Sequence, residues 1–220
     1  MASRVKEPTL ILIFMVLSSL VSASEADQMV LADFSSGQLN GWEPKVFMGE
    51  TRYVITRLDQ IEVLRADSRA SASGLVKNTA VDLRQYPFLN WSWRIENRLD
   101  KLEEQSKSGD DYAARIYIVV SGGWQFWKTR AINYVWANTS PKGHVWPNAF
   151  AGNNAIMMAL RSAEDETATW QSEKRNVAAD FKELFGEEIQ TIDAVALMTD
   201  TDNGKGEVTA FYGDIYFSAR

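Results

Sequence analysis

The sequence predicts an all-β protein, a jelly-roll-type β-sandwich of two antiparallel sheets with one short helix. Apolar and polar side chains alternate in short runs bounded by turn residues, which is the period of a β-strand. The 220 residues are 45% hydrophobic and 24% charged, a composition that builds a packed core and excludes a disordered chain. There are about nine or ten such runs, the number expected for two sheets.

The predicted strands follow one another between turn residues. In the run FLNWSWRI, residues 88–95, every second side chain is apolar, so we expect Trp91 and Trp93 to face the core. Residues 112–120 are apolar on both faces except at Arg115, which predicts a central strand. The other predicted strands are residues 29–34, 53–57, 61–66, 131–137, 155–160, 194–199 and 208–217.

One helix interrupts the strands. Apolar Val177, Phe181 and Leu184 recur at helical spacing, which gives this segment one apolar face. Asn176 is a suitable N-cap, and Gly186 is a suitable C-terminal stop. We expect this helix to cover an open end or edge of the sandwich.

Residues 1–23 have the layout of a secretory signal peptide. A short basic start is followed by the apolar run LILIFMVL and then by small residues, with cleavage expected after Ala23 or Ala26. The alternative is a membrane anchor, but the apolar run is shorter than the roughly 20 residues of a spanning helix. Residues 27–220 are then expected to form a single domain.

Charge and cysteine content limit the function further. Lys and Arg number 23 and Asp and Glu number 29, a net charge of −6 that argues against nucleic-acid binding. The sequence has no cysteine, which excludes a thiol nucleophile, a thiolate metal site and a lipid-modified lipoprotein. No later segment is apolar enough to span a membrane. We expect a periplasmic protein or, alternatively, a secreted one.

Two sets of sequence strings resemble known families. The strings LADFSSGQLNGW near the start and FYGDIYFS at the end resemble galactose-binding-like jelly-roll modules, whose first and last strands lie close together. A longer resemblance is to the bacterial family catalogued as domain of unknown function 3047, which implies no catalytic residue. The strings that carry it are SASGLVKNTAVDL, LNWSWRIEN, KSGDDYAARIYIVV, AINYVWAN, SEKRNVAADFKELFG and VALMTDTDNGKGEVTAFYGDIYF.

The segment KSGDDYAAR carries the densest group of charges. Arg115 lies in an apolar strand, and burial would require a carboxylate partner, for which the candidates are Asp110, Asp111, Glu96 and Glu173. In one interpretation the group is a structural ion cluster. Burial of Arg115 against a neighbouring aspartate would favour this interpretation. In the other, Asp110, Asp111 and Arg115 hold the hydroxyls or a carboxylate of a sugar.

Aromatic side chains suggest a second part of the site. Trp124, Trp127 and Trp146 lie in or beside loops rich in Gly, Lys, Pro and Asn, where an indole is less easily buried. They either stack on sugar rings or cap the ends of the sandwich. The single histidine, His144, also lies in a loop, where it is either solvated or part of a Ser–His–Asp arrangement. No nucleophile elbow, phosphate-binding loop or dinucleotide fingerprint is present in the sequence.

The string MTDTDNGKGE offers oxygen ligands for calcium from Asp200, Asp202, Asn203 and Glu207. The glycine spacing is not that of an EF-hand, and a polar hairpin explains the same residues. A structural calcium ion is the one cofactor that the sequence suggests.

Together these patterns predict an exported, non-catalytic protein that binds a carbohydrate or a cell-envelope glycan. The first alternative is a glycan-active hydrolase or lyase that uses Asp110 or Asp111 with Arg115 and Glu173. The second alternative is a structural envelope protein that binds another protein through an exposed sheet edge.

Overall fold

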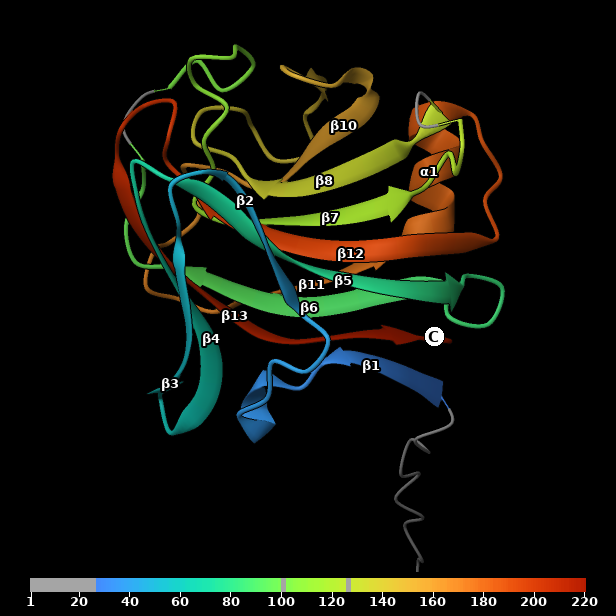
Figure 1. The fold of residues 1–220 in the computed structure, drawn as a ribbon, viewed down its shortest axis with the longest axis horizontal. Coiled ribbons are helices and arrows are strands. Elements are labelled where there is room, and N and C mark those ends of the chain that lie inside the picture. The colour runs from blue at the N-terminus through green and yellow to red at the C-terminus, as the bar shows by residue number, and fades with distance from the viewer. Residues whose placement is uncertain (1–26, 100–101, 126–127) are drawn as a thin grey trace, which may run out of the picture.

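A computed structural model describes residues 27–99, 102–125 and 128–220. Two β-sheets pack face to face around a shared core, with one α-helix at one end (Figure 1). The predicted β-sandwich with one short helix is therefore confirmed. The predicted signal peptide and Trp127 lie outside the described residues. Within the described residues, no helix has the length and apolar character that crossing a membrane requires.

The first sheet, called the A sheet, has the strand order β11-β6-β13-β4-β3, and β1 pairs with β13 beside this path. Its strands are β1 (Gln28–Ala32), β3 (Arg52–Leu58), β4 (Ile61–Arg69), β6 (Phe88–Ile95), β11 (Gln171–Asn176) and β13 (Glu207–Ser218). A 3-10 turn, η2 (Phe34–Ser36), follows β1. All of the described pairings in this sheet are antiparallel.

The second sheet, called the B sheet, has the order β2-β5-β12-β7-β8-β10-β9. Its strands are β2 (Glu43–Met48), β5 (Ala72–Asp82), β7 (Arg115–Val120), β8 (Arg130–Trp136), β9 (Val145–Asn148), β10 (Gly152–Arg161) and β12 (Thr191–Asp200). One pair, β8 with β10, is parallel, so the B sheet is mixed where two antiparallel sheets were expected. The strands β2, β5, β9 and β11 were not among the predicted runs.

The two ends of the described chain meet in the A sheet. Gln28 of β1 pairs with Ser218 of β13, and the pairing continues to Ala32 opposite Ile215. First and last strands therefore lie together, as the resemblance to jelly-roll modules implied.

The core lies between the sheets and is rich in aromatic side chains. Trp91 and Trp93 of β6 both point into it, as their alternation predicts. Trp91 stacks on Tyr134 of the B sheet with ring centroids 5.5 Å apart, and Trp93 lies 6.0 Å from Trp136. These contacts join the inner faces of the two sheets.

The helix α1 (Val177–Phe185) begins and ends where its sequence indicates. The side chain of Asn176 accepts a hydrogen bond from the Ala179 amide, and Gly186 adopts a φ of 68°, which closes the C-terminus. Phe181 is buried in the core. Asp180 of the helix accepts hydrogen bonds from Tyr134 of the B sheet and from Arg175 of the A sheet, so it ties both sheets to α1.

We expect Phe181→Ala to lower the free energy of unfolding by about 3–5 kcal/mol, because it removes a buried ring and leaves a cavity. Phe47→Ala is the matched control, since Phe47 is 67% exposed on β2 and should change stability by less than about 1 kcal/mol. Urea unfolding of both variants measures the difference. Equal losses in the two variants would contradict the docking of α1 on the core.

Candidate functional site

A groove of about 420 Å³ crosses the outer face of the B sheet, and we call it the Arg115 groove. Along β7 the side chains of Ile116 and Ile118 enter the core, so Arg115 and Tyr117 point to the opposite face. Other lining residues are Asn133 of β8, Met198 and Asp200 of β12, and Asp110, Asn148, Phe150, Asp202 and Asn203 of β9 and the neighbouring loops.

Arg115 forms a buried ion cluster under this groove. Its side chain is 4% exposed, pairs directly with Asp200 and lies 3.8 Å from Asp110. Its guanidinium carbon also lies 5.1 Å from the ring of Tyr112 and 5.4 Å from the ring of Tyr117. The cluster is part of the scaffold, since the ion pairs offset the cost of burying the charge, and it also forms the floor of the groove.

The two aspartates beside Arg115 titrate abnormally. Burial raises the pKa of Asp110, while the charge of Arg115 and a hydrogen bond from Asn148 act in the opposite direction. Burial also raises the pKa of Asp200, and Arg115 again opposes the shift. At both carboxyls the charge of Arg115 therefore opposes the effect of burial on the pKa.

Polar atoms without partners lie in the same floor. Asn133 is 1% exposed, and neither its Nδ2 nor its Oδ1 has a hydrogen-bond partner among the described residues. The Nε of Arg115 is likewise unpaired within this part of the chain. An unpaired buried amide costs about 1–3 kcal/mol, so the groove keeps hydrogen-bonding capacity that the fold itself does not use.

Asp111 has a different role from its neighbour Asp110. Its carboxylate accepts hydrogen bonds from the amides of Asn203 and Gly204, at 3.0 and 2.6 Å, and from the Asn203 side chain. It thus holds the turn after β12 rather than lining the groove. Sequence reasoning grouped Asp111 with the ligand-binding residues, but its oxygens are occupied by this turn.

Three carboxylates come close enough to share a metal ion. One oxygen each from Asp111, Asp200 and Asp202 lies within 4.8 Å of the others. Glu207, which the sequence grouped with Asp200 and Asp202, instead pairs with Arg69 at 2.9 Å. Because Arg115 and backbone amides already contact Asp200 and Asp111, the cluster has internal compensation for its charge.

Trp124 and Trp146, the two loop tryptophans within the described residues, do not line a common groove. Trp146 is 4% exposed and packs in a second core cluster with Tyr112 and Met157, so the expectation that it forms a sugar platform is wrong. Trp124 is 83% exposed and lies outside the Arg115 groove. His144 is exposed and stacks on Trp146 with ring centroids 5.3 Å apart.

Glu173 and Glu96 are not partners of Arg115 in this structure. Glu173 lies on β11 of the A sheet, where it accepts hydrogen bonds from Arg161 and Trp93 at 2.6 and 3.1 Å. Glu96 pairs with Arg94 at 2.6 Å. The four residues expected for an enzyme, Asp110, Asp111, Arg115 and Glu173, are therefore divided between the two sheets.

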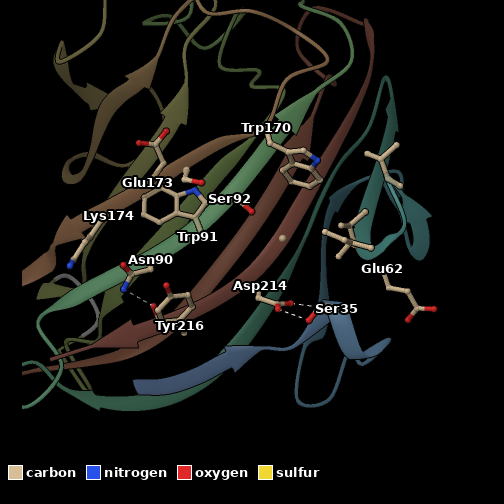
Figure 2. A pocket seen from close by; sticks show the side chains of 15 residues that line it. Ser35, Glu62, Asn90, Trp91, Ser92, Trp170, Glu173, Lys174, Asp214 and Tyr216 are labelled. Carbon is tan, nitrogen blue, oxygen red and sulfur yellow. Dashed lines mark hydrogen bonds between the residues drawn. The ribbon is translucent and has the colours of Figure 1, made fainter. Parts of the chain in front are cut away.

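A second groove, which we call the Trp170 groove, lies on the outer face of the A sheet and measures about 570 Å³ (Figure 2). Its lining includes Asn90 and Ser92 of β6, Tyr216 of β13 and Trp170 in the loop before β11. Sequence reasoning did not single out Trp170. Its position between the polar strings TAT and QSEK is the signal that could have identified it.

Comparison with known proteins gives a family and distant structural likenesses. A model of a family described as protein of unknown function, DUF3047, matches residues 40–216. None of the curated proteins matches this sequence.

Two of the solved structures that resemble the fold are an endoglucanase and a binding module. The endoglucanase cel12A from Rhodothermus marinus has 12% identity and a TM-score of 0.48 over 86% of this chain and 99% of its own. The family 30 carbohydrate-binding module of a Clostridium thermocellum cellulosomal cellulase has 10% identity and a TM-score of 0.45 over 82% and 92%. At these scores the likenesses carry no inference about ligands.

We expect Arg115→Met to lower the free energy of unfolding by about 3–5 kcal/mol, because it leaves buried aspartates without a cation. The double variant Arg115→Met/Asp200→Asn should recover part of this loss. Arg69→Met, which breaks an exposed pair with Glu207, is the matched control and should cost less than about 1 kcal/mol.

The loss in Arg115→Met should also depend on pH. Without Arg115 the folded-state pKa values of Asp110 and Asp200 rise further, so stability is lost as the pH rises above about 3.9, the ordinary aspartate pKa. Urea unfolding at pH 4 and pH 7 measures this. A loss that is larger at pH 4 would contradict the cluster.

Proposed function

The chain belongs to the DUF3047 family of proteins of unknown function. From the geometry of the Arg115 groove we propose that it is an exported, non-catalytic protein that binds a carbohydrate or cell-envelope glycan. Export rests on the predicted signal peptide in residues 1–23. Binding rests on the groove itself, which offers a concave surface of suitable size.

The unpaired amide of Asn133 is the observation that carries this proposal. A side-chain amide both donates and accepts hydrogen bonds, and so do the hydroxyl groups of a sugar. A ligand that reaches Asn133 would remove the penalty that the free protein bears for burying it. Tyr117 and Phe150 also line the groove and supply apolar surface for the C–H groups of a sugar ring.

Charge favours a neutral saccharide over an acidic one. Asp110, Asp200 and Asp202 line the groove, and Arg115 is the cation among the groove-lining residues. An acidic sugar would meet an excess of negative charge, which repels anions in a site of low dielectric constant. We therefore infer a glycan without carboxylate or phosphate groups.

A glycan-active enzyme is the second candidate, because two carboxyls with raised pKa values line one groove. A protonated carboxyl can act as a general acid, and an ionised one as a base or nucleophile. This alternative is tested by incubating the protein with the oligosaccharides that it binds and measuring new reducing ends. Release that Asp110→Asn abolishes would support catalysis and contradict the non-catalytic proposal.

We expect the mature protein to bind selectively on a glycan array and Asn133→Leu to weaken that binding at least about tenfold. Leucine has the same branching of side-chain heavy atoms but no hydrogen-bonding groups, so the variant removes the unpaired amide, and urea unfolding checks that its larger methyl groups leave the protein folded. Asn40→Leu, at an exposed position outside both grooves, is the matched control and should bind normally.

A blank array, or unchanged binding by Asn133→Leu, would overturn the proposal and direct attention to protein partners. The array is run with calcium and with a chelator, because a calcium site that includes Asp200, Asp202, Asn203 and Glu207 stays a prediction. Loss of binding only with the chelator would support it.

A further inference from the structure

A β-bulge forms the floor of the Trp170 groove. The register between β13 and β6 shifts between Tyr212 and Ile215, and Gly213 lies in this bulge. A Cβ atom at Gly213 would lie 2.2 Å from the Ser92 hydroxyl oxygen, so a larger residue would displace Ser92. Glycine at position 213 therefore keeps side-chain atoms out of the centre of the floor.

The bulge also fixes one end of the groove. Asp214, which follows Gly213, accepts hydrogen bonds from the amide and the hydroxyl of Ser35 at 2.9 and 2.6 Å. Ser35 belongs to η2, so this contact holds η2 against β13. Figure 2 shows the Asp214–Ser35 contact beside the groove floor.

One wall of the groove is the indole of Trp170. Trp170 is half-buried and makes no hydrogen bond, ring contact or ion contact with the described residues. Figure 2 shows its ring at the edge of the groove, with Glu62 on the far side. A large apolar ring that packs on no other ring and overhangs a polar floor is suited to stacking on a flat ligand.

Polar groups surround the ring of Trp170 in this groove. The Asn90 amide nitrogen donates to Phe88 and Ser218 at 3.0 and 2.9 Å, which leaves its Oδ1 as an acceptor. Among the residues that the structure describes, the hydroxyl of Tyr216 has no hydrogen-bond partner. An apolar wall with hydroxyl and amide groups around it matches the two kinds of surface on a sugar ring.

We propose that the Trp170 groove is a second saccharide-binding site and that the protein bridges two glycan chains from opposite faces of the sandwich. The two grooves lie on the outer faces of different sheets with the core between them, so their ligands do not compete for space. The site stands on the geometry of the A sheet, whereas bridging also rests on the proposed function of the Arg115 groove.

The test is an NMR titration of the mature protein with cellohexaose, xylohexaose and the N-acetylglucosamine hexamer. We expect shifts of the Gly213 amide and the Trp170 indole N–H in one groove and of the Asn133 side-chain amide in the other. Trp170→Ala should weaken binding at Gly213 roughly tenfold or more and leave binding at Asn133 unchanged. Asn133→Leu should do the reverse.

Trp124→Ala is the matched control, because Trp124 is exposed and lies outside both grooves, and it should alter neither site. Shifts at Asn133 without shifts at Gly213, or shifts at Gly213 that persist in Trp170→Ala, overturn the second site and leave the first intact. Shifts at Gly213 alone retain the second site but exclude bridging and the proposed function. No shift with any hexasaccharide overturns both.

Bridging is measured by light scattering with hydroxyethylcellulose and glycol chitin. The parent protein should raise scattering by cross-linking chains, while Trp170→Ala and Asn133→Leu should each bind without cross-linking. Equal scattering by the parent and both variants would contradict bridging.

Discussion

The buried charge of Arg115 is the constraint on which one end of the B sheet depends. A guanidinium removed from water needs anionic partners, and Asp200 at the end of β12 and Asp110 before β7 supply them. Asp111, next in the chain, then orders the turn at residues 203–204 through backbone amides. Glu104 does the same for the loop after β8, where it accepts from the amides of residues 138–140. Four carboxylates therefore shape the loops around the groove.

The buried carboxylates of this protein and the buried amide of Asn133 differ in whether the fold supplies them with hydrogen-bond partners. Asp111, Glu104 and Asp180 are buried, and each receives several N–H or O–H bonds from the fold, so each has a structural explanation. Asn133 is equally buried and receives none from the described residues. Trp170 is its aromatic counterpart, a half-buried ring that stacks on no other ring among the described residues. The unpaired amide of Asn133 costs the free protein stability, and under the proposals above both side chains are contacts for a ligand.

Local patterns in the sequence were sufficient for most of the core strands and for the helix, but not for the internal strand β5, the edge strands or the site. The strands β2, β9 and β11 lie at sheet edges, and their sequences are polar or contain proline. These strands pair through backbone hydrogen bonds, so they do not need the alternation of apolar side chains by which a strand is predicted. Asp110 was predicted as a partner of Arg115 because the two residues are close in the sequence. Asp200, which pairs directly with Arg115, lies 85 residues further along the chain. Burial of Trp146 likewise depends on Met157 and Tyr112, which only the fold brings together. Asn133, an amide flanked by apolar and aromatic residues in the string AINYVW, was the overlooked signal.

The position of β13 bears on how the chain can fold while it is being made. This strand lies between β6 and β4 and also pairs with β1, yet it is the final strand of the described chain. Until β13 leaves the ribosome, β6 has no partner on that side and β4 is separated from the rest of the A sheet. The A sheet therefore cannot close until residues 207–218 have been synthesised, so the pairing of strands far apart in the sequence is the last step in its assembly.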